Sequence, residues 1–168
     1  MIRAATKVDI PNIVRCNLTA KTLEETIGYA PPLEQRTFAD QNKLKRAWES
    51  RNQVEGEFVY VFEENEEVVA YVLIEVQPDA IEIDNVDVAK NMQGKGIGKA
   101  LVKFVEDLAR EQGKKYVTLG TSRNQETGKP WRSYDFWLRM GYSEDGEIQT
   151  DEGRQNGFTE IRFRRGIH

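Results

Sequence analysis

Hydrophobic residues recur at helical spacing over residues 97–112, the most regular segment of the chain. The apolar positions are Ile97, Ala100, Leu101, Phe104, Val105, Leu108 and Ala109. They follow an i, i+3, i+4 progression and therefore line one face of an amphipathic helix. Gly113 is a typical C-terminal cap for it. Three more helices are expected: one introduced by Asp9, one over residues 37–51 and one over residues 130–140.

Runs of alternating, β-branched or aromatic residues predict the strands. The expected ranges are 2–5, 58–62, 67–76, 80–88, 115–121, 147–150 and 158–165. Segment 67–76 is apolar on both faces, which is typical of a central strand covered on both sides. Polar connections are expected at 122–130 and 151–157. Strand 80–88, helix 97–112 and strand 115–121 together predict a right-handed βαβ crossover.

The strand over residues 80–88 changes its pattern halfway along. Ile81 and Ile83 share one face, whereas the later apolar residues Val86 and Val88 have the opposite parity. A β-bulge between Asp84 and Val86 would reconcile the two registers. We therefore expect this strand to bend before it delivers the chain to the segment that follows.

Length and composition predict one soluble domain over residues 1–168. Apolar residues make up 39% and charged residues 31%, and no apolar run approaches a membrane span or secretory signal. The single cysteine, Cys16, excludes an internal disulfide and favours a reducing, cytoplasmic location. The formal net charge of -4 argues against nucleic acid as the main partner, and no metal-ligand spacing is present.

A glycine-rich stretch joins strand 80–88 to helix 97–112. It reads Gln93, Gly94, Lys95, Gly96, Ile97, Gly98, Lys99. Closely spaced glycines let the backbone approach a ligand, and the helix start offers unpaired amides, so the junction suits a phosphate. The dinucleotide fingerprint fails because Lys99 occupies its sixth position, and the nucleoside-triphosphate loop fails because Ala100 follows Lys99.

The motif Gln/Arg-x-x-Gly-x-Gly/Ala, present from Gln93 to Gly98, resembles the GNAT superfamily of acetyl-CoA-dependent N-acetyltransferases. The resemblance implies an α/β fold with a mixed, mostly antiparallel sheet, a splayed pair of neighbouring strands and flanking helices. It also implies that the glycine-rich loop holds the coenzyme pyrophosphate. By the same resemblance, the backbone at Val86, Asp87 and Val88 pairs with the pantetheine, and Asn124 contacts the coenzyme.

The resemblance also nominates catalytic residues. Glu82, eleven positions before Gln93, matches the catalytic glutamate of the histone-acetylating branch and is the expected general base, with Asp84 as second choice. The family's usual tyrosine is replaced by Trp137, whose indole N–H is not a useful acid. Tyr134, one turn earlier, is the substitute acid, and a reaction without a side-chain acid is the rival interpretation.

Two sets of residues each allow two interpretations: aromatic residues near the start of the chain and basic residues near its end. Tyr29 and Phe38 either line the acceptor pocket or close over the core. Arg162, Arg164 and Arg165 form either a solvated strand end or a contact for an acidic acceptor or the coenzyme's ribose phosphate.

The resulting hypothesis is an enzyme that moves acetyl from acetyl-CoA to a primary amine by direct attack in a ternary complex. One alternative is a catalytically impaired acyl-CoA-binding regulatory module, for which Trp137 is the main argument. Another keeps the chemistry but makes a protein N-terminus or lysine the acceptor. The expected partner is a small-molecule or protein amine, with no nucleic acid, no membrane and no metal, and a homodimer is left open.

Overall fold

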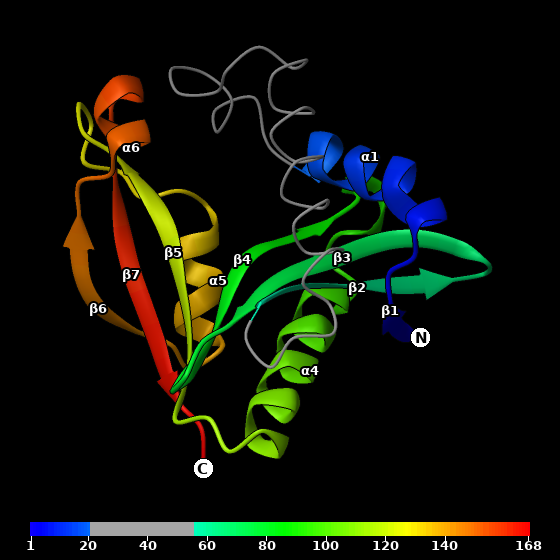
Figure 1. Ribbon diagram of the computed structural model, residues 1–168. Coiled ribbons are helices and arrows are strands. Elements are labelled where there is room, and N and C mark those ends of the chain that lie inside the picture. Colours follow the sequence, from blue (N-terminus) through cyan, green and yellow to red (C-terminus); the bar gives the residue numbers. More distant parts are fainter. Residues whose placement is uncertain (21–55) are drawn as a thin grey trace.

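The computed structural model describes residues 1–20 and 56–168, which form a seven-stranded sheet with helices on its faces (Figure 1). The strands are β1 (Ile2–Ala4), β2 (Gly56–Glu64), β3 (Glu67–Val76), β4 (Ala80–Val88), β5 (Tyr116–Asn124), β6 (Ser143–Ile148) and β7 (Phe158–Gly166). Their order in the sheet is β1-β2-β3-β4-β5-β7-β6. The β4–β5 pair is parallel and the other pairs in this sheet are antiparallel, which confirms the mixed α/β fold class.

Helices cover both faces of the sheet. They are α1 (Ile10–Ala20), α4 (Ile97–Glu111), α5 (Ser133–Arg139) and α6 (Asp151–Asn156), with short 3₁₀ turns η1 (Lys7–Asp9) and η2 (Lys90–Met92). Helices α1 and α4 lie on opposite faces of β3 and β4, and α5 shares its hydrophobic core with α4 (Figure 1). None of the helices in the described parts of the chain combines the length and apolar character needed to cross a bilayer.

The hydrophobic core divides into two clusters because β3 is buried on both faces, as its sequence predicted. On one face, Val72 and Ile74 pack against the apolar stripe of α4, including Leu101. On the other, Leu73 packs with Ile13 of α1. All five side chains are at most 2% exposed, so β3 is the centre of the molecule.

Strands β3 and β4 have the bounds that the hydrophobic pattern predicted, and α4 ends one residue before its expected end, with Gly113 left-handed at φ +68°. The expected helix over residues 37–51, together with Tyr29 and Phe38, lies outside the described residues. Helix α5 begins at Ser133 rather than at residue 130, and β6 covers Ser143–Ile148 rather than residues 147–150.

Two expected loops were wrong. The segment 122–130 is not all loop, because β5 continues to Asn124 through antiparallel pairing with β7, a long-range partner that local polarity does not show. The segment 151–157 contains α6, since the Thr150 side chain accepts a hydrogen bond from the Gly153 amide and Gly157 closes the helix in the left-handed conformation. A polar composition therefore concealed a well-capped helix.

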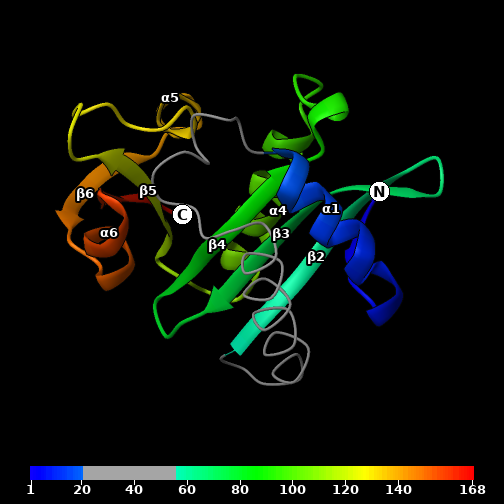
Figure 2. The same ribbon diagram turned by 90° about the horizontal axis from the view of Figure 1, so that it is seen from above.

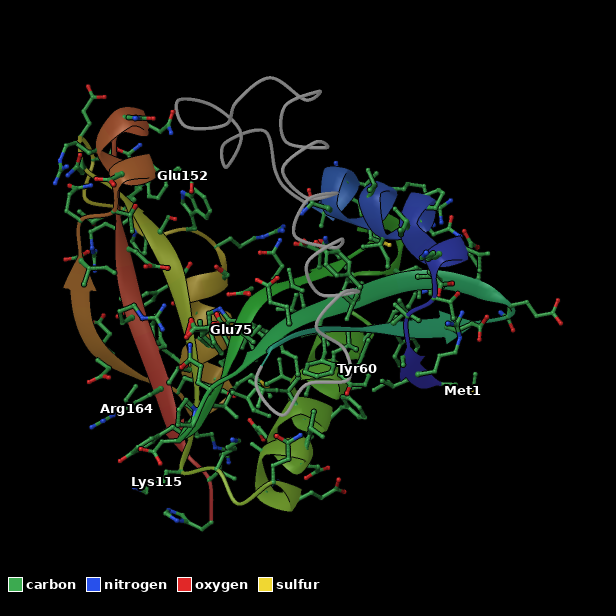
Figure 3. All side chains as sticks on the ribbon, viewed as in Figure 1. Met1, Tyr60, Glu75, Lys115, Glu152 and Arg164 are labelled. Atoms are coloured by element: carbon green, nitrogen blue, oxygen red, sulfur yellow. The ribbon has the colours of Figure 1, made fainter. Side chains whose placement is uncertain are left out.

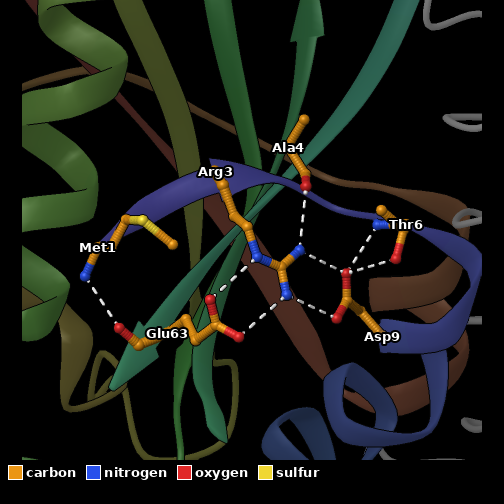
Figure 4. Close-up of polar contacts among 6 residues, drawn as sticks. All are labelled: Met1, Arg3, Ala4, Thr6, Asp9 and Glu63. Carbon is orange, nitrogen blue, oxygen red and sulfur yellow. Dashed lines mark hydrogen bonds and ion pairs between the residues drawn. The ribbon is translucent and has the colours of Figure 1, made fainter. Parts of the chain in front are cut away.

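A polar cluster ties the first strand to the rest of the sheet (Figure 4). The Arg3 guanidinium lies between two carboxylates, 2.8 Å from Asp9 Oδ2 and 3.2 Å from Glu63 Oε2. Asp9 also accepts a hydrogen bond from the Thr6 amide at 2.7 Å, and the Met1 amino group donates to the Glu63 carbonyl oxygen. The cluster stabilises the β1 edge of the sheet, at the opposite side from β5.

Strands β4 and β5 pair over only part of their length. The pairs run from Ala80–Tyr116 to Ile83–Leu119, although β4 continues to Val88 and β5 to Asn124. Beyond the last pair the two strands diverge, and the group β5–β7–β6 turns away from β2–β4 (Figures 1 and 2). The sheet therefore has a closed end and an open end at the β4–β5 junction, and the expected splayed pair is confirmed.

Candidate active site

A bulge in β4 marks the point where the strand leaves β5. Ile83 pairs with Ile74 and Asn85 pairs with Leu73, so Asp84 is the extra residue. The sequence placed this bulge between Asp84 and Val86, so its position was right to within one residue. Residues before the bulge are buried and those from Asp84 to Val88 are half-buried.

The outer edge of β4 beyond the bulge offers backbone groups for a further strand. The Ala89 amide donates to the Val69 carbonyl oxygen at 2.9 Å, so Ala89 and Asp87 direct their backbone groups toward β3. By the alternation of an antiparallel ladder, Val86 and Val88 direct theirs toward the gap beside β5. The Val88 carbonyl oxygen accepts a hydrogen bond from the Gln93 side chain, which agrees with this orientation.

The turn after β4 depends on glycines in the left-handed region. Gly94 has φ +78° and Gly96 has φ +80°, and Gly96 is the N-cap of α4. A Cβ at either position would meet no atom within 4 Å, so the backbone conformation, not crowding, requires glycine. The turn is exposed from Gly94 to Gly96.

The first backbone hydrogen bond of α4 joins the Ala100 amide to the Gly96 carbonyl oxygen at 3.0 Å. The amides of Ile97, Gly98 and Lys99 precede it and therefore have no acceptor within the helix. Their partial positive charges add to the dipole of a fifteen-residue helix. Lys99 is exposed beside them, so this end of α4 is suited to an anion.

Gln93 holds the turn in place from within the protein. Its amide nitrogen donates to the Val88 carbonyl oxygen at 3.0 Å and to the Ala20 carbonyl oxygen at 3.1 Å. The side chain thus joins the end of β4 to the last residue of α1. A Cβ added at Gly98 would lie 3.7 Å from the Val88 side chain and 3.8 Å from the Phe136 ring, which are ordinary contact distances.

Glu82 lies at the closed end of the gap and is 8% exposed. Its Oε2 accepts a hydrogen bond from the Thr118 hydroxyl at 2.6 Å, and Arg162 Nη2 lies 2.6 and 2.7 Å from the two carboxylate oxygens. Both oxygens of the expected base are therefore engaged by protein donors. Its role as general base stays a prediction.

Asp87 belongs to a polar network that the sequence did not indicate. Its Oδ2 accepts hydrogen bonds from the Tyr71 hydroxyl at 2.6 Å and from the Asn17 amide at 3.0 Å. Asn17 also donates to the Tyr71 oxygen, and both side chains are at most 3% exposed. The network packs α1 against β4 at the open end of the gap. The hydrophobic pattern of residues 67–76 predicts only an apolar strand at Tyr71, because it does not show where a hydroxyl points.

Tyr134 lies on the face of the sheet that α5 covers. Its hydroxyl donates to the Glu144 carboxylate of β6, which raises the pKa of the phenol, and its ring packs against Phe163. Trp137, which the resemblance assigns to the position of the family's tyrosine, is 4% exposed and makes edge contacts with the rings of Phe136 and Tyr142. Its ring is therefore part of the core.

The structure does not bring the two expected catalytic residues together. Ile81 and Ile83 pack on the α4 side of β4, so Glu82 between them points to the opposite face. Tyr134 belongs to the core shared by α4 and α5. Glu82 and Tyr134 therefore lie on opposite faces of the sheet.

Asn124 ends β5 and organises the loop that follows. Its side-chain oxygen accepts hydrogen bonds from the amides of Glu126 and Thr127, at 2.9 and 3.0 Å. Its carbonyl oxygen accepts one from the Gly128 amide. The predicted coenzyme contact of Asn124 stays a prediction, since its oxygen already serves the loop and only the amide nitrogen is left to donate.

Cys16 is fully buried, and burial raises the pKa of its thiol to about 11. The thiol packs under α1 in the smaller core cluster. Because the thiolate is the reactive form, this residue is a packing residue, as its helical position predicted.

The comparisons with known proteins agree with this geometry. The model of the acetyltransferase (GNAT) family matches residues 21–142. An uncharacterised N-acetyltransferase from the pepI 3' region of Lactobacillus delbrueckii subsp. lactis is 32% identical over 82 residues, which are 44% of this chain and 47% of that protein. The chain thus matches about half the length of that relative.

Two solved structures share the fold across the chain. An acetyltransferase of the GNAT family from Desulfovibrio desulfuricans superposes with a TM-score of 0.73 at 18% identity, covering 100% of this chain and 99% of that one. An aminoglycoside 6'-N-acetyltransferase complexed with coenzyme A gives 0.69 at 15% identity, covering 100% and 97%. The family match extends over the bulged strand, the glycine turn and α5, and the chain belongs to the acetyltransferase (GNAT) family.

Proposed function

We propose that the protein is an N-acetyltransferase that moves acetyl from acetyl-CoA to a primary amine by direct attack within a ternary complex. The observation that carries the proposal is a combination of two features beside the gap between β4 and β5. The edge of β4 is not paired with β5 beyond Ile83, and the exposed N-terminus of α4 is formed by a glycine-rich turn. The acceptor is a small-molecule or protein amine.

The residues present fit a coenzyme with a diphosphate and an extended amide tail. The unpaired amides of Ile97, Gly98 and Lys99 can donate to phosphate oxygens. The outward N–H and C=O groups of Val86 and Val88 can pair with the tail as a further strand would. The aminoglycoside 6'-N-acetyltransferase of the same fold was solved with coenzyme A, which supports this assignment.

The coenzyme supplies the activated acetyl group as a thioester. The protein must hold the amine in its neutral form and place a donor near the carbonyl oxygen as negative charge develops there. An outward amide of β4, at Val86 or Val88, suits the second task. Glu82 is the predicted base and Asp84 the second choice. Tyr134 is the predicted acid, and its hydroxyl would have to leave Glu144 to serve.

Coenzyme binding tests the proposal directly. We expect titration calorimetry to detect coenzyme A binding, and Gly96→Ala to weaken it by roughly tenfold, since an L residue at φ +80° shifts the amides that follow. Gly113→Ala is the matched control, because it imposes a similar strain at φ +68° beyond the other end of α4. Equal affinities in the two variants, or no binding by the unaltered protein, would contradict the proposed site.

Turnover separates the enzyme from a coenzyme-binding module. We expect thioester consumption with at least one member of a panel of primary amines, including polyamines, aminoglycosides and peptides. Mass spectrometry of the products then distinguishes a small-molecule acceptor from a protein N-terminus or lysine. Tight coenzyme binding without turnover on any of these amines would favour the regulatory module.

A further inference from the structure

The strand β7 reaches across β5 to contact β4, although the two strands are not neighbours in the sheet. Arg162 of β7 lies 2.6 Å from Glu82 Oε2 and 2.7 Å from Oε1. The side chains are 25% and 11% exposed, so the pair is partly shielded from water. This ion pair links the two parts of the sheet that the gap separates.

The ion pair lies where β4 and β5 part. Arg162 pairs in register with Gly120, and the last β4–β5 pair, Ile83 with Leu119, is one residue earlier along β5. On the other side of Glu82, its partner in β3 is Glu75, which Figure 3 labels. Arg162 thus brings a cation to β4 at the closed end of the gap.

A glycine makes room for side chains to pass over β5. A Cβ at Gly120 would overlap the Glu160 carboxyl group, which lies across the β5 backbone. Glu160 Oε1 is 3.5 Å from Arg162 Nη1, so the guanidinium is held between two carboxylates. Burial works against the charge of Arg162, but Glu82 and Glu160 raise the net pKa of its guanidinium above the ordinary value.

A second ion pair joins the same two parts on the opposite face. Arg165 of β7 lies 3.0 Å from Glu106 Oε1 of α4, and the Tyr142 hydroxyl donates to the same oxygen at 3.1 Å. Glu106 is 2% exposed. Positions 162 and 165 are an odd number of residues apart and therefore lie on opposite faces of β7, so their side chains hold β4 and α4 from both sides of the sheet.

From these contacts we infer that Glu82 and Arg162 form a positioning pair, which holds the closed end of the gap and thereby sets the spacing between the free edge of β4 and β5. The inference rests on the proposed function, because it assigns the pair to the gap that receives the coenzyme tail. It differs from the predicted role of Glu82 as general base, since the carboxylate then acts through Arg162 and not on the amine.

The two roles predict different behaviour at the same residue. A base must turn a lone pair toward the amine proton, whereas three of the four lone-pair positions of Glu82 already accept hydrogen bonds from Thr118 and Arg162. A positioning carboxylate instead acts through its ion pair with Arg162. Glutamine at position 82 has neither the charge that pairs with Arg162 nor the basicity, so loss of coenzyme affinity indicates positioning and loss of kcat alone indicates a base.

The test compares Glu82→Gln, Arg162→Met and the double variant, each measured at a temperature well below its melting point. We expect each single variant to weaken coenzyme A binding by about tenfold. The double variant should bind coenzyme A no more weakly than the weaker-binding single variant, because each substitution breaks the same ion pair. We also expect the residual Glu82→Gln activity to keep the pH profile of kcat/KM for the amine.

Arg164→Met is the matched control on the same strand and face. Arg164 stacks on the Tyr116 ring at 5.1 Å and lies 3.8 Å from Asp145, but it does not reach β4. We expect its coenzyme affinity to stay within about twofold of the unaltered protein, since surface ion pairs contribute little.

A different set of results would overturn the positioning role. If Glu82→Gln lowers kcat by roughly a hundredfold, flattens the acidic limb of the pH profile, where a base is lost to protonation, and leaves coenzyme affinity unchanged, Glu82 is the base. Unchanged affinity in Arg162→Met also overturns the inference. Absence of coenzyme binding in the unaltered protein instead contradicts the proposed function, so the two failures are distinguishable.

Discussion

The two ends of β4 differ in burial and in the strands with which they pair. From Ala80 to Ile83 the strand is buried and pairs with β3 on one side and β5 on the other. From Asn85 to Val88 it is half-buried and, among the described strands, pairs with β3 alone. One bulged residue separates the two ends.

This difference shows how a sheet can carry both stability and a binding edge in nine residues. The closed end contributes buried apolar area and a complete hydrogen-bond ladder, both of which stabilise the fold. The open end leaves backbone groups of Val86 and Val88 directed at the gap, where an extended ligand can use them. Substitutions at the two ends should therefore separate effects on unfolding from effects on binding.

The largest expected effect is on stability at the closed end. Ile81 is fully buried, so Ile81→Ala should lower the free energy of unfolding by about 2–5 kcal/mol through lost burial and a cavity. Val86→Ala at the half-buried open end should cost about 1 kcal/mol. Chemical denaturation measures both, and similar costs at the two positions would break the comparison.

The second effect concerns the ion pair between Arg165 of β7 and Glu106 of α4, on the face of the sheet that α4 covers. Among the described residues, Arg165→Met leaves the buried Glu106 carboxylate with the Tyr142 hydroxyl as its remaining donor, so we expect a loss of about 2–3 kcal/mol in unfolding free energy. Adding Glu106→Gln should recover part of that loss. Arg110→Met, which breaks an exposed pair with Asp107 on the same helix, is the control and should cost at most about 0.5 kcal/mol.

The third effect should appear in binding and not in stability. Val88→Pro removes an amide that points to the gap, so coenzyme affinity should fall by about tenfold while the β3–β4 ladder is kept. Asp87→Pro removes an amide that points to β3, and it should lower the melting temperature more than Val88→Pro does. If Val88→Pro is instead the less stable variant, the assignment of the free edge is wrong.

The smallest effect sharpens the comparison at a site remote from both ends. The Arg3 guanidinium lowers the pKa of the Asp9 carboxyl from 3.8 to about 2. Because the folded-state pKa is depressed, this contribution is complete above about pH 4 and is lost as the pH falls toward 2. Asp9→Asn should cost about 1 kcal/mol at pH 7 and reduce the loss of stability between pH 4 and 2. Acid titration of unfolding measures this, and coenzyme affinity at pH 7 should not change.

The sequence predicted the elements whose pattern is local. Hydrophobic periodicity located β3, β4 and α4 because each buries a regular stripe or both faces, and the parity change at Asp84 located the bulge. Polar composition failed at α6, where capping by Thr150 and Gly157 outweighs the absence of an apolar stripe.

The site was predictable only in its local part. The glycines at positions 94 and 96 are required by their own backbone conformation, so the turn could be found from spacing alone. The partners of the charged side chains could not be found from the sequence. Arg162 and Arg165, which the sequence left as a solvated strand end or an anion contact, instead meet Glu82 and Glu106 across the sheet.

By itself the sequence determined the extent of β3, β4 and α4 and the place where the backbone must turn through glycine, because these depend on neighbours within a few residues. Only the tertiary structure decided that β4 leaves β5 after Ile83 and that an arginine 80 residues away from Glu82 occupies its carboxylate. Contacts of that kind depend on strand order and register, which local pattern does not encode.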